Sequence, residues 1–436
     1  MNQQIYWHTT VNMPNDSSLT PIPEKVDVAI IGGGYTGLSA ARTLAQHGVK
    51  VVVLEAETIG WGASSRNGGM TLTGLKLPMQ TITKKYGREI ARELFQCSLD
   101  SVRAVEQIVK EENIDCGFAR TGYLLVANKP SHYEALKAEV DFMAQEFNHT
   151  VKLVPPGELR NEIGSDIFHG GLVDDISGGL NPAQFVAGLA GAAEKAGATL
   201  CARARVNKLR RGENRFILET ERGALHAESV FVATSGYTGN VTQTLQRKII
   251  PIGSFIIATE KLSADLAHEL SPKNRMIFDY KHYLNYFRLW DDRMIFGGRA
   301  AFFPETANTI NSSAAILQRE MIQVFPQLKN AAVEYVWGGT LDFAFDQMTH
   351  VGELDGLYYS LGYAGHGVAM ATHLGKTVAE AMLNGKINEH PFARYAFPNA
   401  PFGLYSRFPW LSMENYGFPW FLPLAGAWYK ILDWVE

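Results

Sequence analysis

The sequence predicts an α/β protein (α+β over the whole chain) in which a discontinuous parallel-sheet domain carries a second domain built on a mostly antiparallel sheet. Three observations support this fold class. Two continuous apolar runs, Val26–Ile31 and Val51–Leu54, flank a helical pattern, as expected of parallel strands covered on both faces. Residues 247–336 instead show the alternation of half-buried strands. Apolar strands recur on both sides of that stretch, at Val230–Ala233 and Leu357–Leu361, so separate segments must build the first sheet.

The composition describes a folded protein large enough for two domains. Of the 436 residues, 46% are apolar and 19% are charged, which is typical of a globular protein with a large core. A net charge of −4 without a basic cluster argues against nucleic acid as a partner. Cys97, Cys116 and Cys201 lie far apart, which is typical of reduced thiols and predicts neither a disulfide framework nor a metal site.

No targeting or membrane segment is visible in the sequence. Residues 1–25 are polar and lack the basic and apolar regions of a signal peptide, so we interpret them as an irregular arm anchored by Tyr6 and Trp7. No apolar run reaches the roughly 18 residues that a membrane-spanning helix needs. We therefore expect a cytoplasmic protein.

The first strand ends in Gly32-Gly33-Gly34-Tyr35-Thr36-Gly37, a G-x-G-x-x-G sequence between a strand and a helix. Gly32 allows the tight turn, Gly34 lets a diphosphate approach the backbone, and Gly37 lets helix and strand pack closely. The helix N-terminus offers N–H groups and partial positive charge to that diphosphate. Glu55 ends the second strand and is suited to accept hydrogen bonds from ribose hydroxyls. The pattern predicts a dinucleotide site, and a structural glycine-rich turn is the alternative.

A second glycine-rich segment follows the second strand. It reads Gly62-Ala63-Ser64-Ser65-Arg66-Asn67-Gly68-Gly69, so hydroxyl and backbone N–H groups surround one arginine. Such a segment is suited to hold phosphate or ribityl oxygens, with Arg66 as the cation. A flexible surface loop is the alternative that composition leaves open.

The middle of the chain alternates helices and short strands. Helical periodicity covers 83–115 and 131–148, with a strand at Gly122–Ala127 between them. Asn181-Pro182 predicts an N-cap followed by proline at the first helical position, and Gly197 ends that helix. A hairpin and a further strand then lead back to the first sheet: Phe216–Thr220, Ala224–Ala227 and Val230–Ala233, the last followed by Thr234-Ser235-Gly236.

The later elements complete both sheets. The expected elements are strands at Gly253–Thr259, Tyr283–Leu289, Arg293–Gly298 and Leu357–Leu361, a helix near Ala314–Val324 and a last helix ending near Leu383. We assign 26–82, 150–246 and 337–390 to the nucleotide domain, 83–149 and 247–336 to the substrate domain, and 391–436 to a C-terminal tail.

Together these blocks resemble the D-amino-acid-oxidase-type superfamily of FAD-dependent amine oxidoreductases. The segment Gly62–Gly69 is similar to the G-A-S-x-R-N-G-G block of its gamma-glutamylputrescine oxidoreductase-like branch. Three further blocks fit the same branch: Tyr286-Phe287-Arg288-Leu289, Gly297-Gly298-Arg299 and Gly365-His366-Gly367-Val368. The resemblance covers nearly the whole chain. It implies FAD rather than NAD, held in a discontinuous Rossmann-like domain beside a sheet-based substrate domain.

The resemblance also implies which residues contact FAD. The fingerprint and Glu55 would face the ADP half, Ser64–Arg66 the phosphates and ribityl chain, and Asn67–Gly69 the isoalloxazine. The full implied set is Gly32, Gly34, Tyr35, Thr36, Gly37, Glu55, Ala56, Gly62, Ala63, Ser64, Ser65, Arg66, Asn67, Gly68, Gly69, Val206, Thr234, Gly236, Gly338, Gly362, Gly365, His366, Gly367 and Val368.

The positions of cysteine and lysine residues bear on how FAD is attached and on the electron acceptor. Sarcosine-oxidase relatives often tether FAD through a cysteine late in the chain, and no cysteine here follows Cys201, so we predict noncovalent FAD. For the oxygen-activating lysine of those relatives the sequence offers Lys281. We expect oxidation of a small amine or amino acid, gamma-glutamylputrescine-like, to an imine and aldehyde, with O₂ giving H₂O₂. The alternatives are a dehydrogenase for amines or N-methyl amino acids, and a non-catalytic flavin-binding protein.

Hydride transfer from an amine α-carbon to the flavin requires side chains that orient the substrate. His366 is a candidate for a flavin hydrogen bond or for substrate protonation, against a purely structural histidine. Arg288 would clamp a substrate carboxylate, against an ion pair with Asp291, Asp292 or another acid. Three aromatic residues would wall an amine pocket, against plain core packing: Tyr286, Tyr363 and Trp337.

The C-terminal tail is dense in aromatic residues, and Ala425, Trp428, Leu432 and Val435 would share one helix face. Packing over the chain's own domains is one interpretation. The other is a homodimer contact or a weak membrane-surface contact, because tryptophan and tyrosine suit such interfaces.

Overall fold

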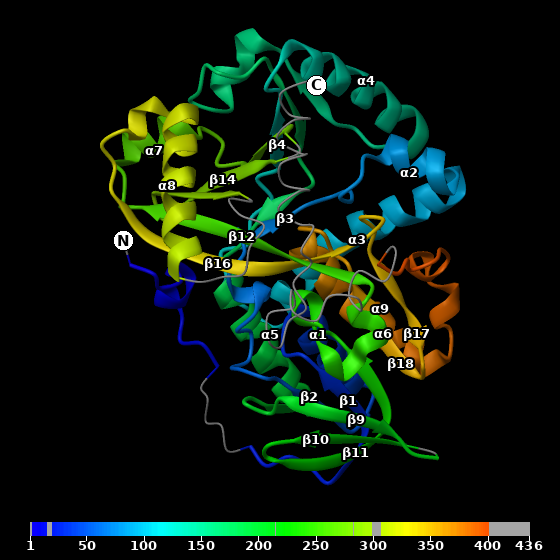
Figure 1. The fold of residues 1–436 in the computed structure, drawn as a ribbon. Coiled ribbons are helices and arrows are strands. Elements are labelled where there is room, and N and C mark those ends of the chain that lie inside the picture. The colour runs from blue at the N-terminus through cyan, green and yellow to red at the C-terminus, as the bar shows by residue number, and fades with distance from the viewer. Residues whose placement is uncertain (1, 15–19, 214, 282, 299–306, 401–436) are drawn as a thin grey trace.

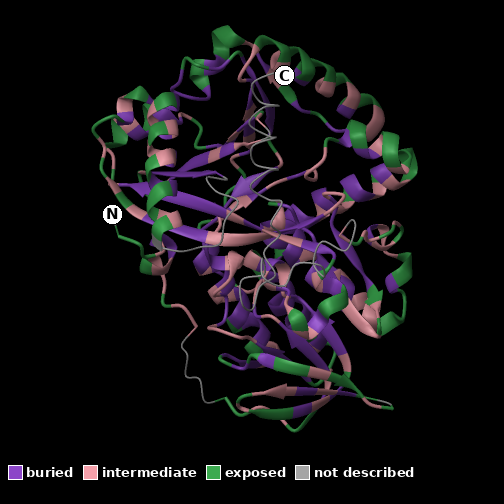
Figure 2. Ribbon diagram, viewed as in Figure 1, coloured by how far each residue is buried: buried purple, intermediate pink, exposed green. Residues whose placement is uncertain are grey.

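The computed structural model describes residues 2–14, 20–213, 215–281, 283–298 and 307–400 (Figure 1). Two eight-stranded sheets dominate this part of the chain, one in the lower half of the view and one in the upper half. Figure 2 shows that buried residues concentrate in their strands and in the helices between them. No helix among these residues is both long and apolar enough to cross a membrane.

The first sheet is built around the strand that precedes the glycine fingerprint. Its strands are β1 Lys25–Ile31, β2 Val51–Leu54, β8 Thr199–Cys201, β9 Val206–Arg211, β10 Phe216–Thr220, β11 Gly223–Val232, β17 His350–Leu354 and β18 Leu357–Leu361. The order β17-β18-β11-β1-β2-β8 is parallel except for β17 with β18, and β9 and β10 extend β11 in antiparallel fashion. The predicted hairpin strand Ala224–Ala227 and strand Val230–Ala233 form one element, β11, because no turn interrupts the ladder.

Both faces of this sheet are covered, as its continuous apolar strands predict. Val28 and Ile30 join the core shared with the helices, whereas Ala29 and Ile31 join the core on the opposite face. The helices of the first core include α1 Tyr35–Gln46, α3 Arg88–Glu111, α5 Pro182–Ala196 and α9 Gly367–Asn384. The sheet is therefore the buried centre of its half of the molecule.

The predicted ends of α5 are confirmed. The Asn181 side chain accepts hydrogen bonds from the backbone N–H groups of Ala183 and Gln184, both at 3.1 Å, with Pro182 at the first helical position. Gly197 adopts φ +107° at the C-terminal end, a left-handed conformation that glycine adopts without steric cost.

The second sheet is mostly antiparallel, which completes the predicted fold class. Its strands are β4 Tyr123–Val126, β5 Lys152–Val154, β6 Gly171–Asp174, β12 Ile249–Thr259, β13 Met276–Asp279, β14 Asn285–Trp290, β15 Arg293–Gly298 and β16 Val333–Ala344. The order is β16-β12-β15-β14-β13-β4-β6-β5, and β13 with β4 is its parallel pair. The remaining elements are α2 Met79–Tyr86, α4 Pro130–Phe147, α6 Gln243–Gln246, α7 Ala264–Leu270, α8 Ala307–Val324 and a small ladder of β3 Met70–Thr71 with β7 Gly178–Gly179.

Two predicted segment boundaries fall inside this second sheet. The strands β5 and β6 lie in the segment 150–246, which was assigned to the nucleotide domain, yet they pair with each other and with β4. The strand β16 likewise crosses the boundary at residue 337. A short apolar run such as Gly171–Asp174 does not indicate which sheet its strand joins, because the strands it pairs with come from distant segments of the chain. Conversely, α3 from the segment 83–149 packs in the core of the first sheet.

The start of the C-terminal tail packs on the first sheet. Tyr395 donates a hydrogen bond from its hydroxyl to the carbonyl oxygen of Thr349 at 2.6 Å, and the Phe397 ring stacks on His350 at 4.2 Å. The aromatic helix face predicted at Ala425–Val435 and Arg299, the last residue of the block Gly297-Gly298-Arg299, lie outside the described residues.

Candidate functional site

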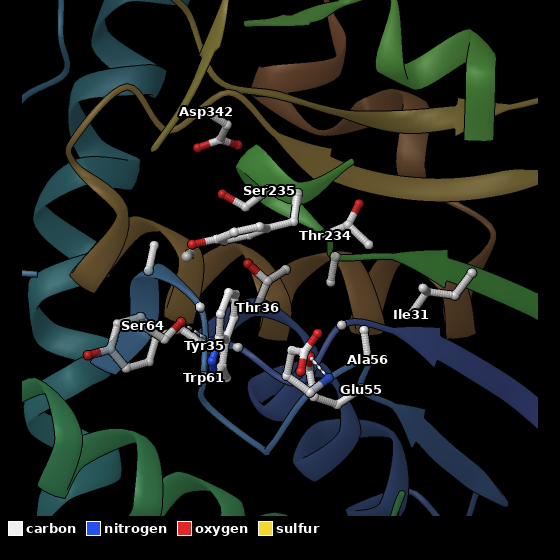
Figure 3. A pocket seen from close by; sticks show the side chains of 18 of the residues that line it. Ile31, Tyr35, Thr36, Glu55, Ala56, Trp61, Ser64, Thr234, Ser235 and Asp342 are labelled. Carbon is white, nitrogen blue, oxygen red and sulfur yellow. Dashed lines mark hydrogen bonds between the residues drawn. The ribbon is translucent and has the colours of Figure 1, made fainter. Parts of the chain in front are cut away.

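A cavity of about 690 Å³ lies at the carboxyl ends of β1, β2 and β11, where parallel sheets commonly bind ligands. Figure 3 labels Thr36, Glu55, Trp61 and Ser64 among the residues that line it. The fingerprint turn, the segment after β2 and the residues after β11 therefore meet at one place, as their order in the sequence predicts.

The fingerprint glycines are required by close packing. Gly32 has φ +112°, and a Cβ there would lie 2.5 Å from the carbonyl oxygen of Ala233. A Cβ on Gly37 would lie 2.0 Å from the carbonyl oxygen of Gly32, and one on Gly34 would lie 2.8 Å from the Ser64 hydroxyl oxygen. The turn can therefore bring its backbone against a ligand only with glycine at these positions.

Two helix N-termini face the cavity. The helix α1 begins at Tyr35; its N-cap residue Gly34 has no side chain to cap it, and the first N–H, that of Tyr35, donates to Ser64 Oγ at 3.0 Å. The helix α9 begins at Gly367, also without a side-chain cap, and Gly367 and Val368 line the same cavity. Uncapped helix N-termini carry free N–H groups and partial positive charge, which favour anionic groups such as a diphosphate.

The Glu55 carboxylate is held in place by backbone N–H groups. Its Oε2 accepts from Gly33 N at 2.7 Å and its Oε1 accepts from Glu57 N at 2.9 Å. Burial raises the pKa of this carboxyl, against the lowering effect of those hydrogen bonds. Carboxylate oxygens retain further lone pairs, so Glu55 can also accept hydrogen bonds from hydroxyl groups of a ligand in the cavity.

The second glycine-rich segment lines the cavity with only some of its side chains. Gly62, Ala63, Ser64 and Asn67 face the cavity. The Arg66 guanidinium stacks on the Trp61 ring at 4.2 Å and donates from Nε to the Trp61 carbonyl oxygen at 2.7 Å. Ser65 Oγ lies 2.8 Å from His8 Nε2 in the N-terminal arm. Arg66 and Ser65 thus fix the segment to neighbouring chain, whereas the sequence assigned them directly to phosphate and ribityl oxygens.

Asn67 organises the end of this segment. Its Nδ2 donates to the carbonyl oxygens of Ala63 and Ser64, both at 3.0 Å, and its Oδ1 accepts from Gly69 N at 2.7 Å. Its own carbonyl oxygen accepts from Trp7 Nε1 at 2.9 Å. These contacts give the turn one conformation where it borders both cavities of the site.

A second cavity of about 320 Å³ opens beside the first. Asn67, Leu341, Gly365 and Val368 line both, so the two cavities adjoin there. The polar and aromatic side chains of the second cavity come from the second sheet, from α3 and α4 and from connecting segments: Asn67, Thr73, Lys76, Phe95, Tyr123, Glu139, His149, Asp174, Ser254, Phe278, Tyr280, Tyr286, Phe343 and His366. The cavity is mainly apolar with a few polar groups, as small-molecule sites usually are.

Asp342 shapes the turn between the cavities. Its Oδ2 accepts from Gly362 N at 2.6 Å and its Oδ1 accepts from Tyr363 N at 3.3 Å, while burial raises the pKa of this carboxyl. Gly362 has φ +86°, which favours glycine. Asp342 also lines the first cavity. Sequence reasoning missed it, because an isolated aspartate within a strand gives no signal of its distant partners.

His366 lines the second cavity, next to the turn formed by Asp342. Burial, aided by the positive charge of Lys76, lowers the pKa of His366 to about 4. The imidazole is therefore neutral near pH 7. A neutral histidine can accept one hydrogen bond and donate another, as either of its predicted roles requires.

The three aromatic residues predicted to wall an amine pocket do not lie together. Tyr286 lines the second cavity, and its hydroxyl lies 3.1 Å from Ser254 Oγ. The Tyr363 hydroxyl instead lies 2.7 Å from Thr36 Oγ1 and donates to the Ser360 carbonyl oxygen at 3.1 Å, so this side chain points to the fingerprint helix. Trp337 is also outside the second cavity, with its Nε1 donating to the Arg66 carbonyl oxygen at 2.8 Å.

Arg288 takes neither of its two predicted roles in this structure. It is 2% exposed, its Nη1 donates to the Gly69 carbonyl oxygen at 2.8 Å, and its guanidinium stacks on Trp290 at 4.8 Å. Burial lowers its pKa to about 9. Asp291, a predicted partner, pairs with Lys261 at 2.8 Å. Arg288 therefore supports the glycine-rich segment from behind the cavity wall.

Other predicted residues also lie behind the walls. Among the described residues, those of the implied FAD set that line neither cavity are Gly37, Ser65, Arg66, Gly69, Gly236, Gly338 and Gly362. Lys281 likewise lines neither cavity and pairs with Asp279 at 3.3 Å. Conversely, Lys76, Tyr123, Glu139 and Tyr280 were missed, because they come from loops and elements without a recognisable motif.

These features fit the FAD that the resemblance implies. A long first cavity, glycines where a Cβ would clash, two uncapped helix N-termini and a buried acid suit an adenine dinucleotide. The adjoining second cavity suits the reacting end of the cofactor together with a substrate.

Comparison with known proteins agrees with this fit. A family model described as FAD dependent oxidoreductase matches residues 27–381. Gamma-glutamylputrescine oxidoreductase of Escherichia coli (strain K12) is 33% identical over 391 residues, which cover 89% of this chain and 90% of that protein. The crystal structure of glycine oxidase from Geobacillus kaustophilus matches with a TM-score of 0.72 and 19% identity, over 86% of this chain and 99% of that one. L-proline dehydrogenase from P. horikoshii matches with a TM-score of 0.69 and 22% identity, over 86% and 98%.

Proposed function

Because the chain belongs to the family of FAD-dependent oxidoreductases and is an enzyme that acts on amines or amino acids, we propose that it oxidises a gamma-glutamylputrescine-like amine. In this proposal the amine carbon loses a hydride and the nitrogen loses a proton, so that the C–N bond becomes an imine, which water hydrolyses to an aldehyde and ammonia. The electrons pass to O₂, which becomes H₂O₂. Because the chain is an enzyme, the non-catalytic alternative is not retained.

One observation favours oxidation at an amine carbon remote from any carboxylate over oxidation of an α-amino acid. The described lining of the second cavity contains Glu139, several tyrosines and Lys76 but no arginine, and Arg288 donates to the Gly69 carbonyl oxygen behind the cavity wall. An arginine is the usual bidentate partner of a substrate carboxylate. An acid and aromatic rings instead favour a cationic amine.

The residues that border both cavities would place the reacting carbon. When bound, FAD supplies the acceptor for the hydride. Asn67 and Gly68 would hold the reacting end of the cofactor on one side, and the turn at Gly365–Val368 would hold it on the other. The positive end of α9 would stabilise negative charge that develops there. Neutral His366 would accept a hydrogen bond from the substrate amine.

We also propose that FAD is bound without a covalent bond. Among the described residues that line the two cavities there is no cysteine. Cys116 and Cys201 are buried in the two cores of the first sheet. Acid precipitation of the purified yellow protein should leave the flavin in the supernatant; flavin retained in the washed pellet would contradict this proposal.

The position of Lys281 favours a second candidate, an amine dehydrogenase with a different electron acceptor. Lys281 pairs with Asp279 and lies outside both cavities, so it is not placed to activate O₂. Mixing the holoenzyme with an amine panel distinguishes the candidates. Flavin bleaching with stoichiometric H₂O₂ in air supports the oxidase. Anaerobic bleaching without peroxide in air supports the dehydrogenase, and bleaching by sarcosine or glycine but by no primary amine contradicts the proposed substrate class.

A further inference from the structure

The second cavity has a polar end away from the cofactor site. Asn67, Leu341, Gly365 and Val368 mark the end that adjoins the first cavity, whereas Glu139 belongs to α4. The helix α4 lies on the opposite side of the molecule from β1 and β2 (Figure 1) and contributes no residue to the first cavity, so Glu139 belongs to the end of the second cavity away from it. Leucine and methionine side chains also line the second cavity, namely Leu125, Leu136, Met143 and Leu172, of which Leu136 and Met143 lie about one turn from Glu139 on α4.

The surroundings of Glu139 are suited to a cation. Its Oε2 accepts from Gln80 Nε2 at 3.2 Å, and burial raises the pKa of the carboxyl. Tyr123 and Tyr280 line the same cavity as Glu139, and burial, together with the negative charge of Glu139, raises the pKa of both tyrosines. A carboxylate beside electron-rich rings is a common arrangement for binding an alkylammonium group.

The other carboxylate of the cavity lining is already occupied by protein groups. Asp174 Oδ2 lies 2.8 Å from His149 Nε2 and accepts from Thr73 Oγ1 at 2.6 Å, and its Oδ1 accepts from Ile176 N at 2.8 Å. Glu139, by contrast, accepts its hydrogen bond from the neutral amide of Gln80. A half-buried carboxylate with a neutral partner is stabilised when a cation enters.

We propose that Glu139 binds a second positively charged group of the substrate, at the end remote from the oxidised carbon. This inference rests on the proposed function and names the class of amine: a molecule with a reacting amine, an apolar or extended stem and a distal ammonium group. The stem lies along the leucine and methionine side chains, and Tyr123 and Tyr280 flank the distal ammonium. Glu139 is thus a specificity-determining residue.

This assignment predicts discrimination against small amino acids. Glycine or sarcosine near the flavin would leave the distal end unfilled and Glu139 without a counter-charge. A monoamine with an apolar tail would place carbon atoms beside the carboxylate and remove its water without replacing the lost hydrogen bonds. A diamine of matching length satisfies both ends of the cavity.

Binding without turnover gives the first test. The probe is 2,5-dimethylhexane-2,5-diamine with its longer homologues, in which neither amine-bearing carbon has a hydrogen to transfer, and the reference is 2,5-dimethylhexan-2-amine with its homologues. Dissociation constants come from perturbation of the flavin spectrum in the purified holoenzyme. We expect Glu139→Gln to weaken diamine binding by about tenfold or more and monoamine binding by less than about twofold. Glu134→Gln, an exposed acid on the same helix, is the matched control.

Turnover gives the second test. For primary diamines of four to ten carbons, Glu139→Gln should raise KM much more than it lowers kcat, and linear monoamines should change little. Equal changes for diamines and monoamines, or no change for either, would overturn the assignment. If no amine reduces the flavin but Glu139 still sets diamine binding, the proposed reaction fails and this site stands. If amines are oxidised without a diamine preference, the site fails and the reaction stands.

Discussion

The indole Nε1 of Trp7 donates a hydrogen bond to the backbone carbonyl oxygen of Asn67 at 2.9 Å. Trp7 is fully buried, and its ring packs edge-on against Trp290 and Trp337. Through this bond the N-terminal arm fixes the segment that separates the two cavities. An arm with no regular strand or long helix therefore contributes to the cofactor site.

Replacing Trp7 by phenylalanine should weaken flavin binding while preserving the fold. Phenylalanine keeps an aromatic ring in the cluster but leaves the Asn67 carbonyl oxygen without its donor, at a cost of about 1–3 kcal/mol. The measurement is the flavin-to-protein ratio after dialysis, with the thermal midpoint alongside. Tyr335→Phe, in the same aromatic cluster, serves as control. Equal flavin content in both variants would show that the bond does not stabilise the site.

Adding a methyl group at Gly34 should expel the cofactor. The new Cβ would stand 2.8 Å from Ser64 Oγ, in the turn that must admit a diphosphate to its backbone. Overpacking of about 1–3 kcal/mol corresponds to a loss of FAD affinity of about 5- to 150-fold. Titration of apoprotein with FAD measures it. Gly191→Ala, in α5 with nothing within 4 Å of the added Cβ, should bind FAD normally. Normal FAD affinity of Gly34→Ala would contradict the proposal that the fingerprint turn holds the diphosphate.

Asp342→Asn should loosen the turn before α9. An asparagine oxygen can accept from Gly362 or Tyr363, but its NH₂ group would face the second backbone N–H. We expect a loss of about 1–3 kcal/mol in unfolding free energy together with a lower flavin content. Denaturant titration of the holoenzyme and absorbance at the flavin band measure both. Glu353→Gln on the exposed side of β17 is the control; a variant as stable as this control would argue against the role of Asp342.

Stability should fall in mild acid through His390. Burial, with the charges of His373 and Arg394, lowers the pKa of His390 to about 4, and its Nδ1 accepts from Phe392 N at 3.3 Å. The unfolded chain binds a proton near pH 6.5, so this contribution is complete above that pH and is lost as the pH falls towards about 4. Denaturation midpoints from pH 7 to pH 4.5 measure the slope. His390→Asn keeps a side-chain acceptor for the Phe392 N–H but does not titrate, so it should flatten the dependence of stability on pH. An unchanged slope would show that another group causes the loss of stability.

The sequence predicts local structure well where the chemistry is local. The glycine fingerprint, the cap at Asn181 and the strand Leu357–Leu361 depend on neighbours in the sequence, and the structure shows each of them as expected. The family can also be predicted from the sequence, because blocks such as Gly62–Gly69 have recognisable residues and follow one another in the expected order.

The direction of each side chain and the sheet that each strand joins were harder to predict from the sequence. Arg66 and Tyr363 point to Trp61 and Thr36 because the packing of distant elements, rather than their own motifs, determines their rotamers. Glu139 faces the second cavity only because α4 folds over it. The strands β5 and β6 join the second sheet through partners that lie outside any local pattern.

The strand order of the first sheet has a consequence for biosynthesis. A ribosome releases β1, α1 and β2 early, yet β1 also pairs with β11, and β11 pairs with β18 at Leu357–Leu361. Until those late segments appear, β1 keeps an open, apolar edge, which is the kind of surface that aggregates or recruits chaperones. The wall formed by Gly365–Val368 is also made last. Nascent chains can therefore present the fingerprint long before they can hold a flavin.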